Sequence, residues 1–119
     1  KNNCAEISIS HKFPYAVVMI HKERACGLDI ERIDKKVLKI KDKFLNHDEA
    51  DYIGESVKNA TIYWAIKEAL YKIEGEPVAF KNIIIKRSTS KNQFECRVNR
   101  KNYTIEVDEL DKHIIAYTN

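Results

Sequence analysis

The chain has 119 residues, with 21 Lys and Arg against 18 Asp and Glu, which gives a formal charge of +3. Hydrophobic residues make up 44% and charged residues 33%, a composition that is typical of a folded soluble domain and argues against disorder. This length favours one compact domain, and the 3 Gly and 2 Pro exclude collagen-like and low-complexity sequence.

Charge, hydropathy and cysteines narrow the class of protein further. A charge of +3 is too small to indicate a nucleic-acid-binding domain, which usually has a concentrated basic face. The longest apolar run, residues 13–20, is much shorter than the ~20 residues that span a bilayer. Cys4, Cys26 and Cys96 are odd in number and form no C-x-x-C pair, which argues against a zinc knuckle. We therefore expect a reduced, cytoplasmic protein with buried thiols, without nucleic-acid or membrane partners.

Hydrophobic periodicity predicts short strands around a few helices. A short helix is expected over residues 37–44, and Asn46 is a candidate cap for a second helix that contains Glu49 in its first turn. The longest helix is expected over residues 60–74, where a glycine and a proline follow. The predicted strands cover residues 5–9, 15–20, 25–33, 80–85, 94–98, 103–107 and 113–117. This pattern predicts an α+β fold.

Two acidic residues share one face of the strand predicted at residues 25–33. Strand alternation places Asp29 and Glu31 on one face, roughly 7 Å apart at the backbone, with Leu28 and Ile30 on the other. Carboxylates this close repel each other unless a positive group lies between them, and Mg²⁺ binds ligands of this kind. The alternative is a pair of exposed acids on an edge strand, neutralised by an arginine or a lysine.

The long predicted helix has an unusual second face. Its first face is an ordinary core stripe formed by Ile62, Ile66, Ala69, Leu70 and Ile73. The opposite face contains Trp64, Glu68 and Tyr71, so we expect this helix to be buried on both sides. A buried carboxylate needs a partner. Glu68 has two candidates: Lys72, one turn further along the helix, or a metal ion shared with the acidic strand.

A third signal follows the first predicted strand, in the sequence Ser8-Ile9-Ser10-His11-Lys12. The two serines lie on one face, and hydroxyl, imidazole and ammonium groups all donate to phosphate. The alternative is a polar turn before Pro14. The chain contains no P-loop, no G-x-G-x-x-G and no G-x-S-x-G motif.

Together these three segments resemble the 4'-phosphopantetheinyl transferase superfamily. The resemblance rests on Ser10-His11, on G-x-D-x-E at residues 27–31, and on W-x-x-K-E-A-x-x-K at residues 64–72. It implies the transfer of phosphopantetheine from coenzyme A to a serine of an apo acyl or peptidyl carrier protein, with release of adenosine 3',5'-bisphosphate. It also implies Mg²⁺ as cofactor, coenzyme A as co-substrate, and an antiparallel sheet packed on one long helix and short helices.

The resemblance assigns roles to the acidic residues and to two lysines. Asp29, Glu31 and Glu68 match the three acidic positions that bind Mg²⁺. Lys72 matches the catalytic lysine near the coenzyme A pyrophosphate. Lys67 matches the lysine directly before the metal-binding glutamate and is assigned to coenzyme A binding.

The resemblance assigns further roles outside these motifs. Ser10 and His11 match the pair that contacts a coenzyme A phosphate, and Lys12 stands where many members have a second serine. Residues 43–49 resemble the segment whose glutamate is the proposed general base, which makes Glu49 the candidate acceptor of the carrier serine proton.

The order of the motifs resembles the second half of the long, two-half members of the family. We therefore expect residues 1–119 to form one half-domain that lacks an N-terminal half, or to associate with other copies. Two alternatives remain: a half-domain that binds coenzyme A or carrier protein without turnover, and a metal-dependent nuclease, whose candidate Glu95-Cys-Arg97 lacks the lysine expected there. The basic run at residues 35–43 is either a solvated helix face or a docking surface for an acidic carrier.

Overall fold

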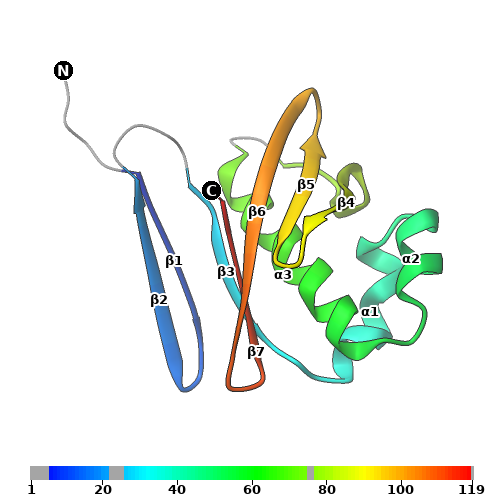
Figure 1. Ribbon diagram of the computed structural model, residues 1–119, viewed down its shortest axis with the longest axis horizontal. Helices are drawn as coiled ribbons and strands as arrows, with labels where there is room; N and C mark the ends of the chain where they lie inside the picture. Colours follow the sequence, from blue (N-terminus) through cyan, green and yellow to red (C-terminus); the bar gives the residue numbers. More distant parts are fainter. Residues whose placement is uncertain (1–5, 22–25, 75–76, 119) are drawn as a thin grey trace.

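A computed structural model describes residues 6–21, 26–74 and 77–118 and shows an α+β fold (Figure 1). In these residues, antiparallel strands form a two-stranded hairpin, β1–β2, and a five-stranded sheet in the order β3-β7-β6-β5-β4. The helices are α1 (Lys36–Phe44), α2 (His47–Ile53), α3 (Val57–Ile73) and the 3-10 turn η1 (Phe80–Asn82). The strands are β1 (Glu6–Lys12), β2 (Tyr15–His21), β3 (Leu28–Arg32), β4 (Ile83–Ser90), β5 (Gln93–Val98), β6 (Lys101–Leu110) and β7 (His113–Thr118).

Helix α3 packs on the larger sheet, chiefly against β3 and β7, and α1 and α2 lie at the right of the view (Figure 1). The core between α3 and the sheet contains fully buried aliphatic residues from both, which include Ile30, Ile66, Leu70, Ile83, Ile105 and Ile114. The predicted α+β class, with an antiparallel sheet on one long helix and short helices, is confirmed.

Strand β3 forms an edge of the five-stranded sheet, because its only partner in that sheet is β7 among the described residues. On its other side lies β1, which contacts β3 while belonging to a separate two-stranded sheet. Figure 1 shows the hairpin beside β3, at the left of the view. The acidic strand therefore lies between α3, β7 and the hairpin.

Side-chain caps explain where α2 and α3 begin. The side chain of Asn46 accepts from the Glu49 N–H at 2.9 Å, and the Glu49 carboxylate accepts from the Asn46 N–H at 3.0 Å, so the predicted cap of α2 is confirmed. Helix α3 begins at Val57, one turn before its predicted start, because Ser56 accepts from the Asn59 N–H at 3.2 Å and caps it. Ser56 was not among the caps predicted from the sequence.

Other predicted boundaries shift for local reasons. Residues 80–82 form a 3-10 turn and not the start of β4. Strand β1 extends three residues beyond its predicted end, because its pairing with β2 continues to Lys12 opposite Tyr15. Cys26 and Cys96 are buried as expected, whereas Cys4 lies outside the described residues. None of the described helices is long and apolar enough to cross a membrane.

Candidate functional site

Gly27, directly before β3, allows α3 to approach the acidic strand closely. A Cβ atom at this position would lie 2.1 Å from the carbonyl oxygen of Ala69, so any larger residue would separate the helix from the strand. Gly27 is also fixed to β7, because its N–H donates to Thr118 Oγ1 at 3.1 Å and its carbonyl accepts from the Thr118 N–H at 3.0 Å. This close contact places the turn of α3 that contains Glu68 beside β3.

The junction of β3 and α3 brings together the three acidic residues that the sequence singled out. Asp29 is only 4% exposed because β1 covers its face of β3, whereas Glu68 is half-buried. Burial, a hydrogen bond to Glu31 and the negative charges of Glu31 and Glu68 raise the pKa of Asp29 to about 9. Burial and the charge of Glu31 also raise the pKa of Glu68. The three carboxyl groups therefore interact with one another.

Two lysines offset this negative charge. Lys72 donates from Nζ to the Leu28 carbonyl at 2.7 Å and lies 3.4 Å from Asp29 Oδ1. Lys12 Nζ lies 3.4 Å from Glu31 Oε1. The alternative expected from the sequence, two exposed acids neutralised by a basic residue, is therefore met in part. The two acids are paired with lysines from α3 and β1, but Asp29 is buried. Lys72 forms its ion pair with Asp29 and not with Glu68. Its positive charge still lowers the pKa of Glu68, against the larger effect of burial.

The acidic cluster offers the ligand chemistry that Mg²⁺ requires. Its donors are carboxylate oxygens, which hard divalent cations prefer. Asp29 Oδ2 is buried and lacks a hydrogen-bond partner within residues 6–21, 26–74 and 77–118, so this oxygen is available for a ligand once Asp29 and Glu31 are both ionised. In the same ranges no three His, Cys, Asp or Glu side chains already form a metal-binding cluster. The donor set fits Mg²⁺ in its chemistry, while the described structure shows no preassembled coordination shell.

The structure separates the predicted Ser10-His11 pair. Ser10 is buried; its Oγ donates to Asp29 Oδ1 at 3.2 Å and accepts from the Ile30 N–H at 3.1 Å. His11 is exposed on the opposite face of β1, since successive side chains of a strand alternate. Lys12, which shares the face of Ser10, reaches Glu31. Ser10 and Lys12 therefore lie at the acidic cluster, and His11 does not.

Aromatic rings line the second face of α3. The Trp64 ring lies 4.9 Å from the Phe44 ring and 5.2 Å from the Phe80 ring, and Tyr71 lies 5.1 Å from Phe80. We call Phe44, Trp64 and Phe80 the aromatic wall. The expected burial of this second face is confirmed for Trp64, which is half-buried, whereas Tyr71 is 37% exposed.

A cavity of about 360 Å³ lies beside the acidic cluster, between β3, α1 and α3. Glu31 and Trp64 line it, together with the cationic residues Lys12, Arg32 and Lys36. Asp34 also lines this cavity, so three cationic and two acidic side chains surround it, and a phosphate would bind there through the cationic ones. From the sequence, Arg32 is expected only as a partner of the strand acids, and Lys36 only as part of the basic run. Their convergence on one cavity depends on how the chain reverses between β3 and α1, which no sequence pattern specifies.

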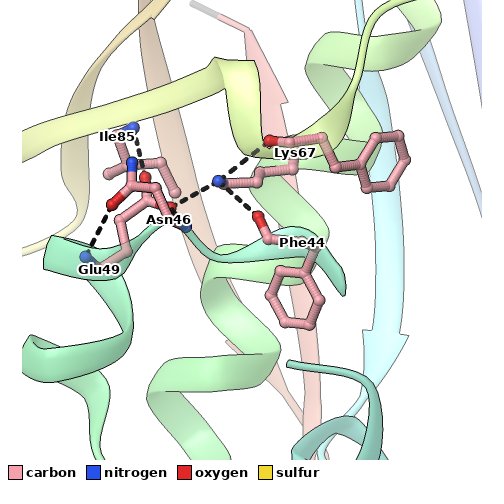
Figure 2. A network of polar contacts seen from close by, with 6 residues as sticks. Phe44, Asn46, Glu49, Lys67 and Ile85 are labelled. Atoms are coloured by element: carbon pink, nitrogen blue, oxygen red, sulfur yellow. Dashed lines mark hydrogen bonds and ion pairs between the residues drawn. The ribbon is translucent and has the colours of Figure 1, made fainter. Parts of the chain in front are cut away.

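The structure places Glu49 and Lys67 in a different environment, a buried network between α3, the end of α1 and η1 (Figure 2). Lys67 is fully buried and donates from Nζ to Glu49 Oε1 at 2.6 Å. Burial lowers the pKa of Lys67, while the hydrogen bond and charge of Glu49 oppose this shift. Glu49 lines a second cavity, of about 270 Å³, with Tyr52 and Tyr63. The proton-acceptor role of Glu49 and the coenzyme A contact of Lys67 stay predictions.

The fold and the site define an α+β protein whose strand–helix junction presents lysine-paired carboxylates beside a cationic cavity. A sequence model of the 4'-phosphopantetheinyl transferase superfamily matches residues 25–118. The chain therefore belongs to this superfamily. The matched range includes Asp29, Glu31 and Glu68, whereas Ser10 and His11 precede it.

A solved structure with a similar fold is that of the Helicobacter pylori holo-acyl-carrier-protein synthase in complex with coenzyme A. The match has a TM-score of 0.65 and 20% sequence identity, and it covers 78% of this chain and 96% of that chain. At this identity the likeness establishes the fold alone. Among curated protein sequences, none matches this chain.

Proposed function

We propose that this protein transfers the 4'-phosphopantetheine group of coenzyme A to a serine of an apo carrier protein, with Mg²⁺ as cofactor. The observation that carries the proposal is the meeting of Asp29, Glu31 and Glu68 at the junction of β3 and α3. The family resemblance assigns Mg²⁺ to these three positions. Superfamily membership supports the reaction class, and the coenzyme A complex of the Helicobacter pylori synthase supports the co-substrate.

The residues of the site have chemistry that suits this reaction. Asp29, Glu31 and Glu68 would hold Mg²⁺, which when bound would supply positive charge to offset the negative charge that develops on the pyrophosphate. Lys72 is held by the Leu28 carbonyl beside Asp29, where its ammonium group would stabilise the charge of the leaving phosphate. Lys12, Arg32 and Lys36 would bind the remaining phosphate oxygens from the cavity wall.

The basic run gives the proposed carrier a place to dock. Lys36, Lys39 and Lys43 are exposed on α1, and Lys36 also lines the cavity. Lys41 differs from them, because its Nζ bonds to the Gly54 carbonyl at 3.0 Å and pairs with Glu55. We propose that the exposed lysines of α1 receive an acidic surface of the carrier protein.

Labelling of an apo carrier protein with a fluorescent coenzyme A tests the reaction. We expect Mg²⁺-dependent labelling by the wild-type protein. Glu68→Gln should keep the fold but lower kcat by ~100-fold or more, the scale seen when one electrostatic contributor leaves an active site. Glu109→Gln, which alters an exposed glutamate paired with Lys58, is the matched control and should label normally.

Two results would contradict the proposal. Labelling at the wild-type rate by Glu68→Gln would remove the metal assignment. Binding of coenzyme A and Mg²⁺ in a calorimeter, without labelling of any carrier, would instead identify a binding module without turnover.

A further inference from the structure

The ammonium group of Lys67 uses its full hydrogen-bonding capacity inside the protein. Its Nζ donates to Glu49 Oε1 at 2.6 Å, to the Phe44 carbonyl at 2.8 Å and to the Phe80 carbonyl at 3.1 Å. A lysine has three N–H donors, so none remains for a ligand. The side chain is also fully buried. This lysine therefore joins the end of α1 and the turn η1 to the middle of α3 (Figure 2).

The carboxylate of Glu49 is similarly occupied on both oxygens. Oε1 accepts from Lys67 and from the Asn46 N–H at 3.0 Å, and Oε2 accepts from the Ile85 N–H at 3.0 Å. Figure 2 shows these partners around the carboxylate. The side chain is 4% exposed. A general base must reach the proton that it abstracts, and protonation of either oxygen here would weaken a buried bond.

The two carbonyls that Lys67 holds belong to residues of the aromatic wall. Phe44 and Phe80 flank Trp64 on α3 with ring separations of 4.9 and 5.2 Å. Trp64 lines the cavity that Glu31 also lines, one helical turn before Glu68. A chain of contacts thus connects the Glu49–Lys67 pair to the cavity beside the acidic cluster.

We infer that Glu49 and Lys67 form a positioning pair that fixes the aromatic wall beside Glu68, and that Glu49 does not accept the carrier serine proton. This inference rests on the proposed function, since it concerns the same reaction. It assigns to Glu49 a role that differs from the one implied by the family resemblance. The pair acts through Phe44 and Phe80 and does not touch the reacting atoms.

The test compares Glu49→Gln, Lys67→Met and the double variant, with Trp64 fluorescence and kcat as the two readouts. Trp64 is the single tryptophan of the chain, so its emission reports the packing of the aromatic wall alone. Each single change leaves one buried charge unpaired, which is strongly destabilising, whereas the double change removes both charges. We therefore expect displaced Trp64 emission and lowered stability in each single variant. The double variant should regain part of the lost stability, because no buried charge is left unpaired, and should keep kcat within about tenfold of wild type. Its Trp64 emission should stay displaced, because methionine at position 67 cannot donate to the Phe44 and Phe80 carbonyls.

If Glu49 were the proton acceptor, the kcat values of the single and double variants would follow a different order. Loss of a general base costs ~10²–10⁴-fold in rate and is not restored by a second change. A double variant that regains stability, but with kcat lowered at least about 100-fold, would overturn the inference. So would a double variant less stable than either single variant. If the wild-type protein labels no carrier, the proposed function fails, while stability and Trp64 emission still test the pair.

Discussion

Ser10 and Asp29 are joined by a buried hydrogen bond of 3.2 Å, in which the serine hydroxyl donates to Oδ1 of the carboxylate. The same hydroxyl accepts from the Ile30 N–H at 3.1 Å. Because a hydroxyl has one proton, this arrangement leaves Ser10 without a donor for a phosphate. In the structure Ser10 orients the carboxylate of a proposed metal ligand.

Replacement of Ser10 by alanine should therefore weaken metal binding. Loss of a group that orients a metal ligand commonly costs 10–100-fold in affinity, so we expect about a tenfold weaker Mg²⁺ or Mn²⁺ affinity in a calorimeter. Ser8→Ala is the matched control, since Ser8 is buried on the same face of β1. The phosphate-contact role predicts the reverse: weaker coenzyme A binding with unchanged metal affinity.

The stability of the metal-free protein should depend on pH through Asp29. Burial and the neighbouring acids raise the pKa of Asp29 to about 9 in the folded state, from an ordinary value of 3.8. Between these values the folded state binds the proton more tightly, so stability falls as the pH rises from about 4 to about 9. Asp29→Asn should flatten this decline in thermal denaturation scans with a chelator present. Equal slopes for the two proteins would contradict the prediction.

Gly27→Ala should unfold or strongly destabilise the protein. The added methyl group would lie 2.1 Å from the Ala69 carbonyl oxygen, and this backbone atom cannot move without displacing α3. Overpacking of this kind costs ~1–3 kcal/mol or more in denaturant unfolding.

Gly54→Ala is the control for the backbone strain that a methyl group can cause without a steric clash. Gly54 has a φ of 56° and open space around its Cβ position, so alanine there adds backbone strain without a clash. We expect a loss of about 1–3 kcal/mol from this strain, with labelling activity retained. Reduced activity in both variants at equal stability would argue against a specific role for the helix–strand contact at Gly27.

Charge reversal on α1 should affect the carrier and not the overall fold. Lys36→Glu combined with Lys39→Glu should raise the apparent KM for an acidic carrier about tenfold at low salt, and less at high salt, because solvent screens such charges. Lys39→Glu alone separates docking from coenzyme A binding, since Lys36 also lines the cavity. Lys101→Glu, an exposed change on β6, serves as control. An unchanged carrier KM would remove α1 as the docking surface.

The fold class and the acidic cluster could be predicted because they depend on local patterns. Strand alternation correctly placed Asp29 and Glu31 on one face, away from the core side chain of Ile30. Helical periodicity identified the second face of α3 that Trp64 and Glu68 share. These patterns repeat every two or 3.6 residues, so they remain visible without knowledge of the tertiary structure.

Contacts between distant segments could not be predicted in the same way. The sequence suggests equal roles for Ser10 and His11, but the packing of β1 on β3 buries the first and exposes the second. Residues 43–49 gave a candidate base, whereas the pairing of Glu49 with Lys67 depends on how α2 packs against α3. Such contacts are set by long-range packing, which periodicity does not encode.

The β1–β2 hairpin has a consequence for how this protein responds to ligands. In the described residues it shares no strand pairing with the five-stranded sheet, and its attachments include Ser10 to Asp29 and Lys12 to Glu31. A cation that takes both carboxylates competes with these attachments, so cation binding and hairpin docking are linked equilibria. If a partner binds the hairpin and thereby changes the affinity of the protein for the cation, then the cation changes the affinity of the protein for that partner by the same factor.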